Sequence, residues 1–146
     1  IAIRFDEQDV RPMGRTAHGV KGSSLAYGDE VVAMDSVADE SFEVLTATEF
    51  GMGKRTAVSE YRKQTRGGKG IINIKITEKT GLVVGMRVIN PQQEIMMITS
   101  AGIIIRIDVD GISQFGRNAQ GVKLMPLNDD DKVVSLAAIH HEEDDD

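Results

Sequence analysis

The chain contains no cysteine, no tryptophan and only three prolines among 146 residues. The lack of cysteine excludes disulfides and thiolate zinc sites, and it fits the reducing environment of a cytoplasmic protein. No apolar run approaches the roughly 18 residues of a membrane-spanning helix. The opening residues have neither the basic start nor the cleavage site of a signal peptide, and without an initiator methionine we expect a piece of a longer chain. Four Phe and two Tyr leave few platforms for stacking unpaired bases.

Charge is distributed unevenly along the chain, whose formal net charge is −6. Eight of the 23 acidic residues fall within the last 18 positions, where Lys132 is the one lysine or arginine. The first 128 residues therefore hold 16 basic and 15 acidic side chains and are nearly neutral. Within residues 52–75, seven basic side chains face the single acid Glu60. This pattern indicates a neutral body with a basic segment and an acidic tail, which does not exclude a nucleic-acid partner.

The sequence repeats itself at intervals of 51 residues. The shift aligns two arginines, a glycine and a pair of apolar residues in three copies. The aligned sets are Arg4, Arg55 and Arg106; Arg15, Arg66 and Arg117; Gly19, Gly70 and Gly121; Val31, Leu82 and Val133; and Val32, Val83 and Val134. We therefore divide the chain into copies at about 1–40, 41–91 and 92–139, followed by an acidic tail at 140–146 that we expect to be disordered.

Each copy is expected to form four short β-strands. In the second copy the predicted strands are residues 44–48, 54–58, 71–77 and 83–89, which are rich in apolar and β-branched residues. Along 71–77 the alternation places three residues on one predicted face, Ile72, Ile74 and Ile76. Four strands in about 51 residues is typical of a propeller blade. The predicted fold is all-β, a propeller-like arc of about three four-stranded blades.

In each copy a glycine-rich loop carries an arginine four residues before the aligned glycine, with a lysine nearby. Glycine lets backbone amides approach a ligand closely, and Arg and Lys make charge-assisted hydrogen bonds to phosphate. Such loops, repeated along one rim, would hold a bent duplex by its backbone. The alternative is that the glycines form tight turns and the arginines brace neighbouring blades. The candidate DNA contacts are Arg15, Lys21, Lys54, Arg55, Arg62, Lys63, Arg66, Gly67, Gly68, Lys69, Arg106, Arg117 and Lys123.

The sequence shows no pattern of a catalytic or metal site. The phosphate loop G-x-x-x-x-G-K-[ST] and the motif H-E-x-x-H are both absent. Asp108 and Asp110 start like a calcium loop, but the later ligands do not follow, and we interpret the segment as a turn. His18 is interpreted as a turn residue, and Tyr27 and Tyr61 have no base or metal partner in the sequence. We therefore expect no enzymatic activity, metal or cofactor in this chain.

The ordered set of motifs closely resembles the C-terminal DNA-wrapping domain of bacterial DNA gyrase A subunits. The resemblance covers essentially the whole chain, through residues 9–15, 51–61, 81–85, 95–99 and 116–122. It implies a β-pinwheel, a propeller-like ring of about six blades whose strands are exchanged between neighbours. The implied function is to wrap duplex DNA around a basic rim in support of negative supercoiling. The implied partners are double-stranded DNA, the remainder of the gyrase A subunit, and the gyrase B subunit, in the bacterial cytoplasm at the nucleoid and without a membrane.

The resemblance also assigns one loop to a degenerate copy of the family's signature box, formed by Gln64, Thr65, Arg66, Gly67, Gly68, Lys69 and Gly70. The second box position is normally basic, and here it is Thr65. By its place in the chain this copy belongs to a later blade, with the main box upstream. The cleaving tyrosine, ATP and Mg²⁺ of the holoenzyme belong to sites elsewhere, so the resemblance implies no catalytic role and no cofactor here.

The resemblance further implies a regulatory tail, in which Glu142, Glu143, Asp144, Asp145 and Asp146 compete with phosphate for the rim. The alternative is a tail that only adds solubility. Two other functions also fit the sequence: the C-terminal domain of a topoisomerase IV A-type subunit, which selects DNA geometry, and a protein-binding propeller-like platform. The Arg-Gly-Gly-Lys-Gly run at 66–70 and the regular repeat favour gyrase.

Overall fold

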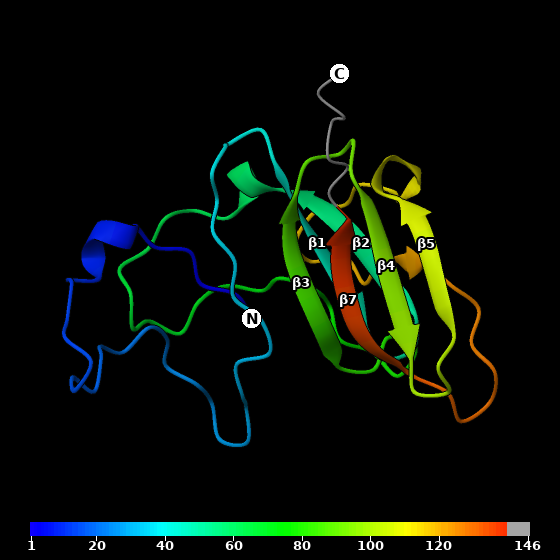
Figure 1. Cartoon of the computed structure of the whole chain (residues 1–146), viewed down its shortest axis with the longest axis horizontal. Helices are drawn as coiled ribbons and strands as arrows, with labels where there is room; N and C mark the ends of the chain where they lie inside the picture. Colours follow the sequence, from blue (N-terminus) through cyan, green and yellow to red (C-terminus); the bar gives the residue numbers. More distant parts are fainter. Residues whose placement is uncertain (140–146) are drawn as a thin grey trace.

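The computed structural model describes residues 1–139, and these form strands, short 3-10 helices and loops without an α-helix (Figure 1). The strands are β1 (Glu43–Thr48), β2 (Met52–Ala57), β3 (Val83–Ile89), β4 (Glu94–Thr99), β5 (Ile104–Asp108), β6 (Val122–Lys123) and β7 (Val133–Ile139). The 3-10 helices are η1 (Glu7–Asp9), η2 (Val58–Glu60) and η3 (Val109–Gly111). The all-β prediction is confirmed.

Two antiparallel sheets are built on the same plan. The first has the order β3-β1-β2-β6 and the second the order β5-β4-β7. Each starts from a tight hairpin, β1–β2 or β4–β5, whose turn contains a glycine in the left-handed region, Gly51 (φ 80°) or Gly102 (φ 83°). A strand from the end of the same copy then pairs with the first hairpin strand, β3 with β1 and β7 with β4.

The fourth strand of the first sheet comes from the following copy. In the β2–β6 pair, Gly53 lies opposite Val122. The same exchange recurs one copy earlier, where Ala2 bridges Ile71. The third copy therefore completes the sheet of the second, and the second copy bridges the first at the equivalent position, as in a strand-exchanged propeller.

The exchange confirms the 51-residue repeat at the level of individual contacts. The helices η1, η2 and η3 start at residues 7, 58 and 109. The parallel bridge Arg4–Lys63 recurs as Arg55–Gln114. The hydrogen bond from the Ser24 amide to the Gly68 carbonyl (2.8 Å) recurs from Lys75 to Ala119 (3.2 Å). The interface between copies is thus itself a repeated structure.

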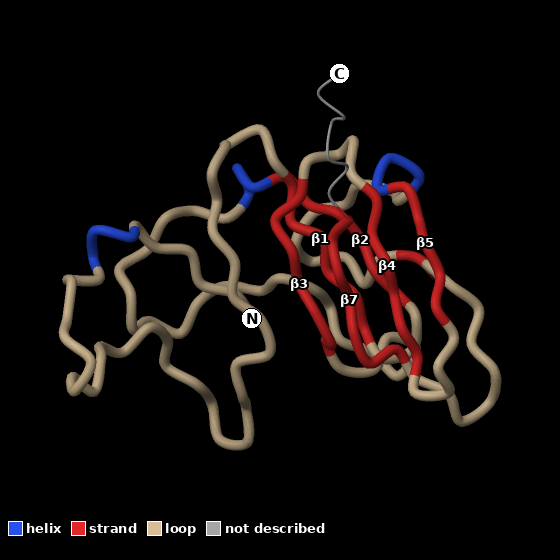
Figure 2. The backbone as a smooth tube through the Cα atoms, in the orientation of Figure 1, coloured by secondary structure: helices blue, strands red, loops and turns tan. Residues whose placement is uncertain are grey.

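The first copy differs from the expected four-stranded blade, since residues 1–42 form isolated bridges, loops and the short helix η1 but no strand (Figure 2). Residues 32–38, which align with β3 in the repeat, form no strand. Among the described residues, the second sheet has three strands and no counterpart of β6. Within residues 1–139 the chain therefore contains one four-stranded sheet, one three-stranded sheet and a first copy joined to the second by isolated bridges.

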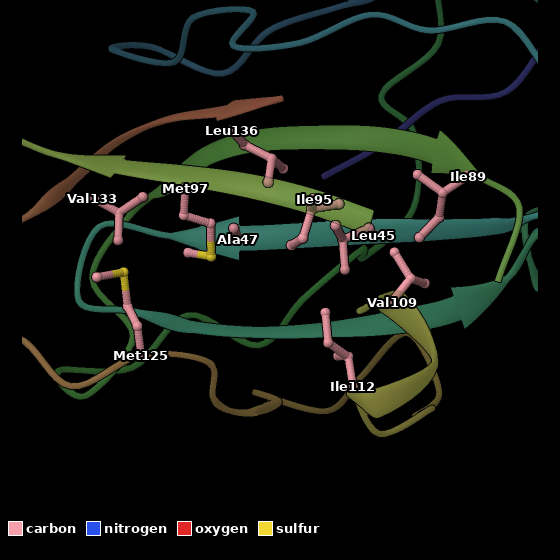
Figure 3. Packing of buried hydrophobic residues seen from close by; sticks show 10 residues of the cluster. All are labelled: Leu45, Ala47, Ile89, Ile95, Met97, Val109, Ile112, Met125, Val133 and Leu136. Atoms are coloured by element: carbon pink, nitrogen blue, oxygen red, sulfur yellow. The ribbon is translucent and has the colours of Figure 1, made fainter. Parts of the chain in front are cut away.

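The main hydrophobic core lies between the two sheets (Figure 3). Leu45 of β1 and the β4 residues Ile95 and Met97 are fully buried there. A second cluster, around Val44, Val58 and Tyr61, packs the other side of β1 against parts of the first copy. Because both faces of β1 are covered, all six of its residues are buried.

The prediction of a strand at 71–77 is wrong. Ile72 and Ile76 are 48% exposed, whereas Asn73 and Ile74 are buried. Asn73 accepts a hydrogen bond from the Tyr61 hydroxyl and donates to Thr46 Oγ1 at 3.0 Å. This polar network holds the segment by its asparagine, so the alternating isoleucines do not define a buried face.

Candidate nucleic-acid interface

The glycine-rich loops form the seams between copies. Gly70 and Gly121 both lie in the left-handed region, with φ of 79° and 84°. A Cβ on Gly121 would lie 2.3 Å from the Gly53 carbonyl oxygen, and one on Gly70 would lie 2.4 Å from that of Ala2. Glycine is required at these positions so that the backbones of neighbouring copies can approach.

The backbone of the degenerate box, residues 64–70, is largely used by the first copy. The Gln64 amide donates to Arg4 O (2.7 Å), and the Gly67 amide donates to Gly22 O (2.7 Å). The Gly68 carbonyl accepts from the Ser24 amide at 2.8 Å. The two box amides of Gln64 and Gly67 are therefore not available to cradle phosphate, and the side chains of Thr65 and Lys69 remain exposed.

In the aligned set Arg15, Arg66 and Arg117, the last two arginines hydrogen-bond to the backbone of the preceding copy. Arg66 donates from Nη1 to Lys21 O (3.0 Å) and from Nε to Asp9 O (2.9 Å). One copy later, Arg117 donates to Ile72 O (2.9 Å), the counterpart of the bond to Lys21. Of the two interpretations left open by the sequence, these contacts favour bracing for Arg66 and Arg117. Arg15, in the first copy, is exposed.

The arginines of the other aligned set, Arg4, Arg55 and Arg106, each form an ion pair with a glutamate. Arg55 donates from Nε to Ile112 O (2.5 Å) and lies 3.2 Å from a carboxylate oxygen of Glu43 across the β1–β2 hairpin. Arg106 and Glu94 form the equivalent pair across β4–β5. A partly buried, paired arginine has little charge to offer a phosphate, so Arg55 belongs to the interface between copies.

Lys54 was predicted to contact DNA, and its burial in the structure contradicts that prediction. Its side chain is completely buried, and Nζ donates to Gly116 O (2.6 Å) and Arg117 O (2.8 Å). Burial lowers the pKa of Lys54 to about 8, with the Arg117 charge acting in the same direction and Glu60 opposing it. A lysine held in this way cannot touch a duplex on the surface.

The cations that do face outward are mainly lysines. Five of the candidate DNA contacts are exposed: Arg62, Lys69, Lys123, Lys21 and Lys63, the last within 3.6 Å of Asp6. The structure adds three exposed lysines that the loop pattern missed, Lys75, Lys79 and Lys132. Their positions carry no lysine in the other copies, so repetition gave no signal for them.

Some of these lysines surround an exposed aromatic residue, in a group we call the Phe50 cluster: Phe50, Met52, Lys79, Lys123 and Lys132. The first four line an open hollow of about 490 Å³ at the end of the β1–β2 hairpin. Lys132 Nζ lies 5.7 Å from the centre of the Phe50 ring and 3.7 Å from a Glu49 carboxylate oxygen. The cluster joins positive charge from two copies on one surface.

The residues that the sequence analysis considered for catalysis or metal binding lie as follows. Among residues 1–139, no group of three or more His, Cys, Asp or Glu side chains is placed to hold a metal ion. Burial raises the pKa of Tyr61 to about 12, and its hydroxyl is bonded to Asn73, so it is a structural tyrosine. Tyr27 and His18 are exposed in the first copy. None of the helices found in residues 1–139 has the length and apolarity needed to cross a membrane.

The architecture defines a class: strand-exchanged, propeller-like β repeats with basic side chains on their outer loops. A family model described as "DNA gyrase C-terminal domain, beta-propeller" matches residues 1–38, 43–90 and 93–140, and the chain belongs to this family.

Curated relatives and solved structures agree with the family. The chain is 52% identical to the DNA gyrase A subunit of Staphylococcus epidermidis and 50% identical to that of Staphylococcus aureus, in each case over 97% of this chain and 16% of the relative. The chain thus spans about one sixth of the length of these relatives. A structure titled "Structure of DNA gyrase A C-terminal domain" superposes with a TM-score of 0.86 at 30% identity, covering 93% of this chain and 46% of that one. The C-terminal domain of DNA topoisomerase IV gives the same TM-score at 26% identity, covering 92% and 42%.

Proposed function

We propose that this chain is a non-catalytic module that binds the backbone of duplex DNA and helps to wrap it, as part of a DNA gyrase. The observation that carries the proposal is the Phe50 cluster, whose lysines come from two copies and lie on the outer surface. Lysines on flexible stems suit phosphate contacts without base readout. The scarcity of aromatic residues favours a duplex over unpaired strands.

The remaining parts of the proposal follow from family membership. The partners would be the gyrase B subunit together with the rest of the gyrase A protein, in the cytoplasm of a bacterium. ATP, Mg²⁺ and the cleaving tyrosine would belong to those other parts, and this chain would use no cofactor. The acidic residues 142–146, which lie outside the described residues, would compete with phosphate for the rim.

The experiment that tests binding is a salt series with a 40-base-pair duplex. We expect the observed binding constant to fall steeply with salt, because each phosphate contact releases counterions. The double variant Lys79→Ala/Lys123→Ala should reduce the slope of log K against log salt by about 2. Arg87→Ala on β3 removes a positive charge away from the Phe50 cluster and is the control. A slope unchanged in the double variant, or reduced equally by Arg87→Ala, would place the DNA elsewhere.

A second candidate, selection of DNA geometry, is favoured by the equal TM-score of the topoisomerase IV domain. The two functions differ in what they do to topology. Wrapping should change the linking number of a relaxed plasmid that is nicked and religated in the presence of the chain. Geometry selection should leave the linking number unchanged while discriminating between supercoiled and relaxed plasmid in a binding competition.

A further inference from the structure

The interface between the second and third copies contains a buried lysine that the other copies lack. Lys54 aligns with Ile3 and Ile105 in the 51-residue repeat. An aliphatic residue therefore suits this position in the fold, and the charge in the second copy is not needed to build a blade. A buried ammonium group is costly to desolvate, and such a group often fixes a conformation rather than adding stability.

The lysine acts on one loop. Its Nζ donates to two successive carbonyls, Gly116 O at 2.6 Å and Arg117 O at 2.8 Å. The neighbouring Arg55 holds the start of the same segment through Ile112 O, Ser113 O and the Phe115 amide. From the far side, Arg117 reaches Ile72 O at 2.9 Å. The segment 112–117 is thus fixed on both sides by the second copy.

The corresponding loop of the second copy has no such donor. There the residues aligned with Gly116 and Arg117 are Thr65 and Arg66, and the residue aligned with Lys54 is the apolar Ile3. The two interfaces share the strand exchange and the arginine brace but differ in this lysine. The third-copy loop leads directly into β6 and Lys123, which belongs to the Phe50 cluster.

We infer that Lys54 is a positioning residue for DNA binding, which fixes the 116–121 loop so that Lys123 is presented at the Phe50 cluster. The inference rests on the proposed function for its DNA readout, but the ordering of the loop is independent of it. The charged groups facing Lys54 are Glu60 of η2 and Arg117 of the loop itself. Burial of the Lys54 charge thus lowers the stability of the fold somewhat, while its two hydrogen bonds fix the position of the loop.

The test uses Lys54→Met, which keeps the length of the side chain and removes the donor, with Arg87→Met as a control of equal charge change. Amide hydrogen exchange should show lower protection of residues 116–121 in Lys54→Met and no change in Arg87→Met. Affinity for the 40-base-pair duplex should fall about three- to tenfold in Lys54→Met alone, the effect of one unfixed contact segment. If wild type itself fails to bind the duplex, the proposed function fails, and hydrogen exchange still decides the positioning role.

The pH dependence of stability reports separately whether the Lys54 ammonium group is buried in the folded protein. Because the pKa of Lys54 is lowered to about 8, the unfolded state holds more protons between pH 8 and about 10.5, and stability should rise with pH there. Lys54→Met should lose this rise. Should Lys54→Met fail to fold, Lys54→Ile carries the residue found in the other copies, and the Lys54 Cε resonance of wild type can be titrated directly. Unchanged loop protection, or a titration near 10.5, would overturn the inference.

Discussion

At the scale of single residues, the structure separates two uses of glycine. Gly102 and Gly121 have nearly the same left-handed φ, 83° and 84°. A Cβ on Gly102 would meet nothing within 4 Å, whereas one on Gly121 would collide with the Gly53 backbone. At position 102 glycine is needed only for the turn conformation. At position 121 it is also needed because the backbones of two copies come into contact there.

We therefore predict that the two alanine substitutions differ in cost. Gly102→Ala should lower the free energy of unfolding by about 1–2 kcal/mol, the penalty of the left-handed conformation. Gly121→Ala should cost more, about 3 kcal/mol, because the β2–β6 pair must also separate. Urea denaturation of both variants gives the comparison, and equal losses would show that the close approach is not required.

Asp131 stabilises the turn of the β4–β5 hairpin through hydrogen bonds. Its Oδ1 accepts from Ser100 Oγ (2.6 Å), from the Ala101 amide (3.0 Å) and from the amide of Lys132 (2.9 Å). These bonds, led by Ser100, lower the pKa of Asp131 to about 2. The carboxylate form is thus favoured by folding.

We predict that the contribution of Asp131 to stability is lost at low pH. A lowered carboxyl pKa gives stability that is present above about pH 4 and lost as pH falls toward 2. Asp131→Asn should therefore lower the melting temperature at pH 7 and have a much smaller effect at about pH 2.5. Thermal melts across this range test the sign, with the exposed Asp129→Asn as control. A deficit in Asp131→Asn that is constant with pH would contradict the role of the charge.

At the scale of elements, the sequence was informative where strands pair within one copy. The predicted strands at 44–48, 54–58 and 83–89 correspond to β1, β2 and β3, because the burial of these strands is set by the hairpin and its own third strand. The segment 71–77 was predicted wrongly, since Asn73 bonds to Tyr61 and Thr46 of other elements. Lys54 was misplaced for the same reason: its partners are 62 and 63 residues away. A repeat shows which positions are equivalent and does not show which side chains cross to the next copy.

For the strands themselves we predict a strong contrast between β4 and β7. Met97 of β4 is fully buried between the sheets, whereas Val134 of β7 is 54% exposed. Met97→Ala should cost about 2–5 kcal/mol of stability through the lost burial and the cavity it leaves. Val134→Ala should change stability by less than about 0.5 kcal/mol. Similar losses in chemical denaturation would show that the core does not lie between the two sheets.

At the scale of the whole molecule, the copies are joined by backbone pairing and by the arginine brace. The first copy has no sheet of its own, so its order depends on contacts such as those of Arg66 with Asp9 and Lys21. The glycine-rich loops that the sequence assigned to DNA also make hydrogen bonds between neighbouring copies. Among the exposed lysines, Lys21 and Lys123 occupy the same repeat position, whereas Lys75, Lys79 and Lys132 have no lysine at the equivalent positions.

Arg66→Ala should accordingly loosen the first copy rather than act only on DNA. Loss of two hydrogen bonds should cost about 1–2 kcal/mol locally. We expect faster amide exchange in residues 9–24 of Arg66→Ala and no change in the exposed neighbour variant Lys69→Ala. Lys69→Ala should instead weaken duplex binding. Unchanged exchange in Arg66→Ala would mean that this arginine is free to contact DNA after all.

The exchange of β6 into the sheet of the preceding copy has a consequence for how such a molecule evolves. Because both junctions share the strand exchange and the arginine brace, a duplication or loss of 51 residues would lengthen or shorten the arc without requiring a new kind of junction. The length of duplex that such an arc could follow would then change in whole steps. During evolution the number of copies would then set the length of bound duplex. The lysines that differ between copies would set the affinity for DNA separately.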